Sequence, residues 1–345
     1  MTEQAVTLRD VAARAGVHPA TASRALNPET RLLVKEETAQ RVLEAAELLG
    51  YHPNPVARSL RTRRSHTVGV IIPDLTNPLF PPIVRGLEDR LAAAGYVALI
   101  GNTDGRLWSC AIRLTSTTGS PVRAASASSG SLRCAVASTI PSAWRARICS
   151  KTRRSRSPSP SVSVDNESGM RMAVAHLIAQ GHRRIAHIAG PQEVSTGLYR
   201  YRGFVSAMEA HGLAADPSLI EIAKAFSIEE GLRCTRMLLD RGGCTAVAAA
   251  NDMLAVGCFA ALDEAGLSCP DDLSVVGFND MPFIDRLRPP LTTIRFPHYQ
   301  VGTEAAQLLL ELISDGSGPV KVLYLAPELV VRGSTAPYGE GPHAG

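Results

Sequence analysis

The sequence predicts an α/β protein in two parts: a small all-α head and a larger body built on two doubly wound parallel sheets. Two short amphipathic helices joined at Gly16 predict the head, since such a pair forms a helix-turn-helix. Beyond residue 66, apolar runs of strand length alternate with helical runs as far as residue 313. This alternation is typical of βαβ units and predicts the parallel sheets of the body.

The composition is that of a soluble globular protein and argues against other classes. Hydrophobic residues make up 45% and charged residues 20% of the 345 residues. No run approaches the ~20 apolar residues that a membrane helix requires. The polar N-terminus lacks the apolar stretch of an export signal, and the seven cysteines form no C-x-x-C pair. We therefore expect a cytoplasmic protein with free thiols and no membrane partner.

The net charge of +4 does not by itself indicate DNA binding, because one stretch carries the excess. Residues 105–164 contain nine arginines, one lysine and no acidic residue. Taking the +10 of this stretch from the total of +4 leaves −6 on the remainder of the chain. The distribution of charge is therefore more informative than the sum.

The head is expected to contain three helices. Thr7 and Asp10 have the spacing of a capping box, which predicts a helix starting at Thr7. Gly16 can supply the positive φ of a tight turn, and Pro19 can start a second helix over 19–26. A third helix is expected over 35–49, before Gly50. At this point a helical hairpin with no role in DNA binding remains an alternative.

The body is expected to contain at least six strands and six helices. The strands are predicted at 68–72, 96–101, 185–189, 219–223, 246–250 and 273–277. The helices are predicted at 80–94, 166–180, 198–212, 228–240, 252–265 and 298–313. Ligands of open parallel sheets bind beyond the carboxyl ends of the strands, so the loops after these strands are where we expect a binding site.

Four blocks of the sequence resemble successive landmarks of the LacI/GalR family of bacterial regulators, in order and at the usual spacing. They are TLRDVAARAGV, TASRALN, LGYHPNPVARSLRT and TVGVIIPDLTNPLF. The resemblance implies a body like that of periplasmic binding proteins, with two subdomains forming a clamshell. It divides the chain into a DNA-binding head at 6–53, a hinge helix and linker at 54–66, an N-terminal effector subdomain at 67–162 and 292–325, and a C-terminal one at 163–291 and 326–335.

The resemblance also implies which residues contact DNA. Arg24 lies on the helix that would enter the major groove, and its guanidinium suits a guanine edge. Leu60 in the hinge helix matches a residue that wedges into the minor groove; the alternative is an apolar linker residue with no role in DNA binding. His18 stands where the family usually has a capping serine. The implied DNA-contacting residues are Thr7, Pro19, Ala20, Thr21, Ser23, Arg24, Asn27, Arg58 and Leu60.

A second set of residues matches positions that line the effector cleft in the family. Asn279 stands where relatives more often have aspartate. A surface position for Arg200, and a purely structural role for Phe80 and Phe226, are the alternatives. The implied effector-binding residues are Leu79, Phe80, Thr196, Arg200, Phe226, Asn251 and Asn279.

Nothing in the sequence predicts an enzyme, a cofactor or a catalytic residue. The sequence contains no phosphate-binding G-x-x-x-x-G-K-[ST], no H-E-x-x-H, no G-x-S-x-G and no G-x-G-x-x-G after a strand. His176, His182 and His187 lie close in sequence. Their spacing places them on a helix, a turn and a strand, so we expect no metal site there.

The segment 106–160 matches no element of the predicted fold. It is rich in Ser, Arg, Ala and Thr, lacks acidic residues and holds both tryptophans, where two helices and two strands are expected. Natural disorder is one explanation. Our hypothesis is that a pair of compensating frame changes in a GC-rich gene, or in its sequencing, replaced the native residues. The flanking segments stay in register, as this hypothesis requires.

These observations together predict a transcription regulator, most simply a repressor. It would bind a palindromic operator on double-stranded DNA as a homodimer, or as a tetramer, under the control of a sugar-like effector. Alternatives are a periplasmic-type solute-binding protein, a sugar-modifying enzyme and a damaged, non-functional regulator.

Overall fold

The computed structural model describes residues 6–27, 30–51, 66–102, 123–128, 131–135, 160–315 and 320–339. The chain divides into two compact units, 1–65 and 66–345. The predicted hinge helix, with Arg58 and Leu60, lies outside the described residues, as does most of the segment 106–160.

The first unit contains the three predicted helices. They are α1 (Leu8–Ala15), α2 (Pro19–Ala25) and α3 (Glu36–Leu48), with a short 3-10 turn at Arg31–Leu33. Gly16 ends α1 in the left-handed conformation, with φ of 65°. Small side chains let the helices pack closely around a core of Val11, Ala12, Ala15, Ala22, Ala25, Ala39, Val42, Ala45 and Ala46.

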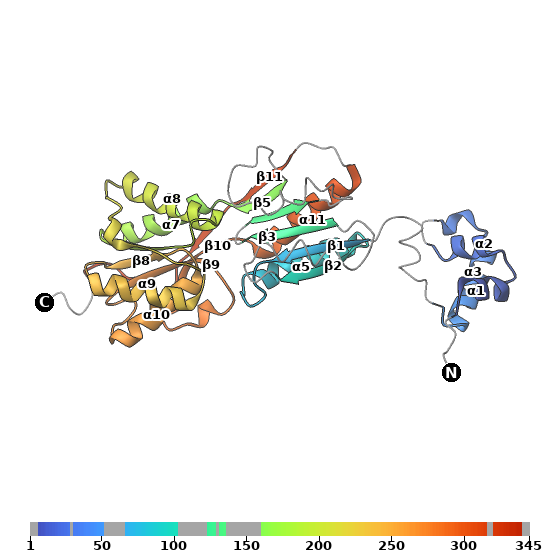
Figure 1. The fold of residues 1–345 in the computed structure, drawn as a ribbon, viewed down its shortest axis with the longest axis horizontal. Coiled ribbons are helices and arrows are strands. Elements are labelled where there is room, and N and C mark those ends of the chain that lie inside the picture. The colour runs from blue at the N-terminus through green and yellow to red at the C-terminus, as the bar shows by residue number, and fades with distance from the viewer. Residues whose placement is uncertain are drawn as a thin grey trace. The chain divides into compact units, whose positions relative to one another are not determined.

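The second unit contains two six-stranded sheets (Figure 1). The first has the order β11-β5-β4-β3-β1-β2. Its strands are β1 (Thr67–Ile72), β2 (Val97–Asn102), β3 (Arg123–Ser128), β4 (Ser131–Ala135), β5 (Ser161–Val164) and β11 (Val322–Leu325). Helices α5 (Phe80–Ala93) and α11 (His298–Asp315) pack against each other in this half.

The first sheet is mixed rather than fully parallel. β1 pairs in parallel with β2 and β3, whereas β4 is antiparallel to both β3 and β5. Only two residues separate β3 from β4 in the sequence. Such a connection allows a hairpin, while a parallel pair needs a crossover of a dozen or more residues.

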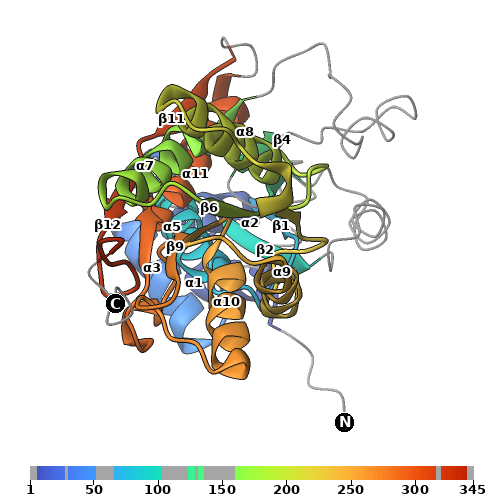
Figure 2. The same cartoon turned by 90° about the vertical axis from the view of Figure 1, so that its left-hand side faces the viewer.

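The second sheet follows the expected doubly wound pattern, with the order β12-β10-β9-β8-β6-β7. Helices α7 (Asn166–Ala179) and α8 (Ser195–Ala210) cover one face, and α9 (Ile228–Arg241) and α10 (Asp252–Ala265) cover the other (Figures 1 and 2). Only β12 is antiparallel to its neighbour, among the described pairs. The strands are β6 (Ile185–Ala189), β7 (Ile220–Ile222), β8 (Ala246–Ala249), β9 (Ser274–Asn279), β10 (Thr292–Arg295) and β12 (Glu328–Val330).

The chain passes between the two sheets three times: after β5, after β10 and after β11. These crossings correct two expected limits. β10 pairs with β9 in the second sheet, although the sequence analysis placed residue 292 in the first half. β5 continues to Val164 in the first sheet, two residues beyond the expected limit. In addition, α8 begins at Ser195 rather than Leu198, which places Thr196 on the helix that was already expected to contain Arg200.

Candidate functional site

The second helix of the head presents an open face. Ala20 and Arg24, one helical turn apart, are exposed, whereas Ala22 and Ala25 are buried in the core. The Nδ1 of His18 accepts a hydrogen bond from the backbone N–H of Ala20 at 3.2 Å. His18 therefore caps α2.

The other predicted DNA-contacting residues of the described head are Thr7, at the start of α1, and four residues on or next to α2. Asp10 Oδ2 accepts from the backbone N–H of Thr7 at 2.8 Å and from its hydroxyl at 2.7 Å, which fixes the start of α1. These hydrogen bonds lower the pKa of Asp10. Thr7 is exposed, while the remaining predicted residues are half-buried: Pro19, Thr21, Ser23 and Asn27.

The body contains a polar recess between its two halves. Its volume is about 10 Å³, and its lining is Asn77, Leu79, Arg200, Phe226, Asn251 and Asn279. Five of the seven residues predicted to bind an effector thus meet at one place. Phe80 and Thr196 are not in the lining: both are buried, Phe80 in the core of the first half and Thr196 in the first turn of α8.

Each lining residue follows the carboxyl end of a strand, as parallel sheets predict. Asn77 and Leu79 lie between β1 and α5, and Asn251 is the N-cap of α10 directly after β8. Phe226 precedes α9, and its ring occupies the space above Gly190. A Cβ on that glycine would lie 2.3 Å from the ring. Glycine at this position therefore allows the aromatic wall of the recess.

Arg200 is the central polar residue of the recess and is 2% exposed. It donates from Nε to Asn166 Oδ1 at 2.9 Å, from Nη1 to the carbonyl of Ala250 at 2.6 Å, and from Nη2 to Asn279 Oδ1 at 3.1 Å. Its Cζ lies 3.8 Å from the centre of the Phe278 ring. Burial lowers the pKa of Arg200 to about 9, so the guanidinium remains charged at neutral pH.

A buried carboxylate lies near Arg200 but outside the lining. Asp252 Oδ2 accepts from the backbone N–H of Met281 at 2.8 Å, and Oδ1 accepts from the hydroxyl of Thr293 at 2.6 Å. Burial raises the pKa of Asp252 to about 6, although both hydrogen bonds and the charge of Arg200 oppose this shift. Asp252 thus holds the end of β9 against β10.

The backbone at the end of β9 is held in an uncommon conformation. Asn279 and Asp280 have φ values of 122° and 57°. The carboxylate of Asp280 pairs with Arg295, and with Arg332 Nη2 at 2.7 Å. Strained backbone of this kind persists only where surrounding contacts fix it, and it concentrates at functional sites.

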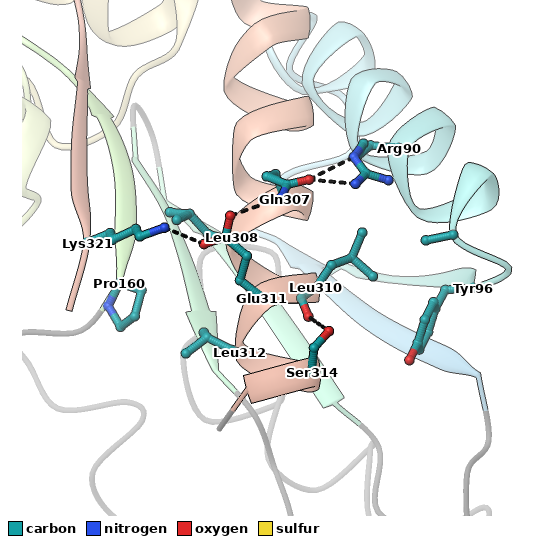
Figure 3. Close-up of a pocket in the computed structure, with 11 residues that line it drawn as sticks. Arg90, Tyr96, Pro160, Gln307, Leu308, Leu310, Glu311, Leu312, Ser314 and Lys321 are labelled. Atoms are coloured by element: carbon teal, nitrogen blue, oxygen red, sulfur yellow. Dashed lines mark hydrogen bonds and ion pairs between the residues drawn. The ribbon is translucent and has the colours of Figure 1, made fainter. Parts of the chain in front are cut away.

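A larger cavity, about 580 Å³, lies along α5 and α11 (Figure 3). Its polar groups bind one another: Arg90 donates to Gln307, and Lys321 donates to Glu311 at 2.7 Å. Figure 3 shows these side chains pointing toward each other along its wall. Because few polar groups converge on its interior, this cavity is a weaker candidate site than the recess.

Comparison with known proteins decides the family. Residues 7–54 match the model of bacterial regulatory proteins of the lacI family, and 174–335 match that of a periplasmic binding protein-like domain. The repressor CytR of Escherichia coli K12 is 36% identical over 96% of this chain and 97% of its own length. The chain belongs to the LacI family. A second LacI-family relative, the ribose operon repressor of Halalkalibacterium halodurans, is 33% identical over 95% of the chain.

Two solved regulators share the fold, over different lengths of the chain. The Lac repressor bound to ONPG in its repressed state has a TM-score of 0.78, with 27% identity over 96% of this chain and 100% of that one. The Enterococcus faecium regulator with bound ribose has a TM-score of 0.63, with 29% identity over 79% of this chain and 99% of that one. Relatives named as repressors are DNA-binding regulators, and none of the names above is that of an enzyme.

The described part of this LacI-family chain contains no group of three potential metal ligands. The three neighbouring histidines bind separate partners: Thr335 for His176, Thr245 for His182 and the carbonyl of Ala248 for His187. Within the same residues, no helix is long and apolar enough to cross a membrane.

Two residues of the recess were missed from the sequence. Asn77 lines it, and Asn166 supports Arg200 from behind. Both follow the carboxyl end of a strand, β1 and β5 respectively. The rule places Asn77 in an expected loop, whereas no strand was predicted before Asn166, so the rule did not reach that residue.

Proposed function

We propose that the chain is a sequence-specific DNA-binding repressor, controlled by a sugar-like small molecule. The observation that supports this proposal is the solvent-exposed face of α2. Ala20 and Arg24 point away from a compact core, on a helix whose start is fixed by His18. A helix of this kind can enter the ~12 Å major groove and present such side chains to base edges.

A single head of this size reads one half-site, so a palindromic operator calls for two copies. We therefore propose a homodimer as the working unit, with a tetramer as a higher assembly of the same unit. A solved Lac repressor is described as a dimer bound to operator, which supports the dimer. Action on operator DNA also implies a cytoplasmic location.

The recess supports the effector half of the proposal. Relatives include a ribose operon repressor and solved regulators with ribose or cellobiose bound. The volume of about 10 Å³ holds about one water molecule. A sugar therefore needs the two halves to part at the three crossings, and its binding would shift the population of conformations that bind operator.

The deciding experiment is binding of the full chain to a library of palindromic duplexes at several salt concentrations. A regulator should select a subset of sequences and hold them more tightly than random DNA by about 10³-fold or more. Both affinities should fall as salt rises, because phosphate contacts release counterions. Equal affinity for all duplexes would reject the proposal.

A periplasmic-type solute-binding protein has the same kind of body but no DNA-binding head, so the presence of the head argues against this alternative.

A damaged regulator is the second candidate, and one observation favours it. The apolar side chains of Val97, Leu99 and Ile100 on β2 are exposed, by 63%, 55% and 43%. Such a protein would bind operator without responding to an effector. A panel of neutral and anionic sugars, added to the operator complex, separates the two.

A further inference from the structure

The side chains that line the recess have more free hydrogen-bond donors than acceptors. Asn77 Oδ1 accepts from the backbone N–H of Leu79 at 3.0 Å, and Asn251 Oδ1 accepts from the N–H of Leu254 at 2.9 Å. Asn279 Oδ1 accepts from Arg200. Each partner can only donate, so the orientation of each side-chain amide is fixed. All three amides therefore leave their NH₂ groups for a ligand.

Arg200 adds to this set of donors. Its three hydrogen bonds go to neutral oxygens, and within the described residues no carboxylate lies within ion-pair distance of it. A guanidinium has five N–H groups, so two remain. The charge is also removed from water, since Arg200 is 2% exposed. A buried cation of this kind favours a charged partner.

The nearest carboxylate cannot serve as an acceptor for a ligand. Asp252 is not in the lining, and its two oxygens bind Met281 and Thr293. Asp280 pairs with Arg295 and Arg332. The lining thus contains one arginine, three asparagines, a leucine and a phenylalanine, and no acidic side chain.

We propose that the recess takes an anionic oxo group, the carboxylate or phosphate of a small sugar acid or sugar phosphate. The inference rests on the proposed function and names the chemical class of its effector. An oxo anion only accepts hydrogen bonds, and therefore satisfies several donors without presenting a donor of its own. Charge-assisted bonds to Arg200 would also be about twice as strong as neutral ones.

A neutral sugar fits this lining less well. Each hydroxyl that accepts from Asn77, Asn251 or Asn279 also carries a hydrogen that needs an acceptor. A carboxylate at position 279 would supply a free and stronger one. With asparagine, the hydrogen can bind only an amide oxygen that already accepts one hydrogen bond, which is a weaker acceptor than a carboxylate. Residue 279 thereby determines the charge preference of the site.

The test compares matched ligands by calorimetry on the full chain. The pairs are ribose with ribose 5-phosphate and glucose with gluconate, and inorganic phosphate is measured alone. We expect one anion of a pair to bind about tenfold more tightly than its neutral partner. Preference for the phosphorylated or the carboxylated member identifies the source of the charge. Binding of inorganic phosphate would show that the oxo anion suffices.

The variant Asn279→Asp replaces the free NH₂ by a carboxylate oxygen while keeping an acceptor for Arg200. We expect it to weaken binding of the anion about tenfold or more and to strengthen binding of the neutral partner. Gln300→Glu makes the same change of charge at an exposed position of α11 and should leave both affinities unchanged.

Neutral sugars that bind as tightly as their anionic partners would overturn the inference. So would failure of every anion to bind, or an unchanged preference in Asn279→Asp. Operator selection by the head is measured separately. A protein that selects operator sequences but prefers neutral sugars therefore keeps the proposed function and loses only this inference.

Discussion

The guanidinium of Arg200 on α8 donates to the side-chain oxygen of Asn279 at the end of β9, across 3.1 Å. The same guanidinium reaches Asn166, directly after the first crossing, and the carbonyl of Ala250 at the end of β8. One buried side chain thus ties together the ends of two strands and the start of α7. The recess depends on it for both shape and charge.

Replacement of Arg200 by lysine should destabilise the body. An ammonium group cannot reach all three oxygens in their present places, so at least one or two buried acceptors lose their donors. We expect a loss of about 2–4 kcal/mol in the free energy of unfolding, measured with urea. Arg202→Lys, at an exposed position two residues away, should change stability by no more than about 0.5 kcal/mol. Equal losses of unfolding free energy in the two variants would show that the hydrogen bonds of Arg200 do not stabilise the body.

Asp252 should make the free energy of unfolding depend on pH. Its pKa is about 6 in the folded chain, against an ordinary value of 3.8, so the folded state binds the proton more tightly. The stabilisation that protonation of Asp252 provides is complete below pH 3.8 and is lost as the pH rises through about 6. In Asp252→Asn, Oδ1 can still accept from Met281 and the NH₂ can donate to Thr293.

The unfolding free energy of the wild type, relative to Asp252→Asn, should therefore rise as pH falls from 7 to 4. The rise over this range should be about 2 kcal/mol, out of the ~3 kcal/mol that is equivalent to the whole shift in pKa and is reached only below pH 3.8. Urea titrations of both proteins at intervals of pH measure this difference. A difference that is flat across that range would contradict the raised pKa.

Much of this site could be predicted from the sequence because of one geometric rule. Loops that follow parallel strands meet at one edge of a sheet, so Arg200, Phe226, Asn251 and Asn279 were expected together before any contact was known. The rule does not specify which hydrogen bonds these side chains form. The sequence did not reveal that each asparagine turns its oxygen to the protein, which follows only from the positions of their backbone and guanidinium donors.

The elements that escaped prediction are short or depend on distant residues. β10 and β12 have four and three residues, and β12 is defined by its antiparallel pairing with β10 more than 30 residues earlier. In the head, local capping was sufficient: the pairing of Thr7 with Asp10 and the turn at Gly16 fixed the first helix to within one residue.

Arg24→Ala tests direct reading of bases by α2. The change should cost about 1–3 kcal/mol of operator binding and relax the preference at one base position. Random DNA should be bound nearly as before. Arg236→Ala removes a positive charge from the surface of the body, where Arg236 pairs with Glu264, and should leave operator binding unchanged. Equal losses on operator and random DNA would show that Arg24 contacts phosphate instead.

Gly302→Ala tests the packing of α11 on α5. A Cβ at residue 302 would lie 1.9 Å from the carbonyl oxygen of Ile83, a backbone atom that cannot move away by a change of rotamer. We expect a loss of about 3 kcal/mol or more in unfolding free energy. At the exposed Gly101 on β2, a Cβ would meet only the carbonyl oxygen of Val70, at an ordinary contact distance of 3.9 Å, so Gly101→Ala is the matched control and should be tolerated. Similar effects of both changes would argue against this helix contact.

The final prediction concerns the gene. In a doubly wound sheet, helices cover both faces, yet Val97, Leu99 and Ile100 on β2 are exposed among the described residues. The residues that follow Asn102 in the sequence carry no apolar helical pattern that could cover them.

If two frame changes flank residues 106–160, one of the other two reading frames should encode helices and strands in alternation, with acidic residues restored. Resequencing and retranslation of this interval check the prediction directly. A chain made with the restored residues should also unfold at a higher urea concentration than the present one, because it would bury the apolar side chains of β2. Absence of that alternation from both frames would leave the segment native as written.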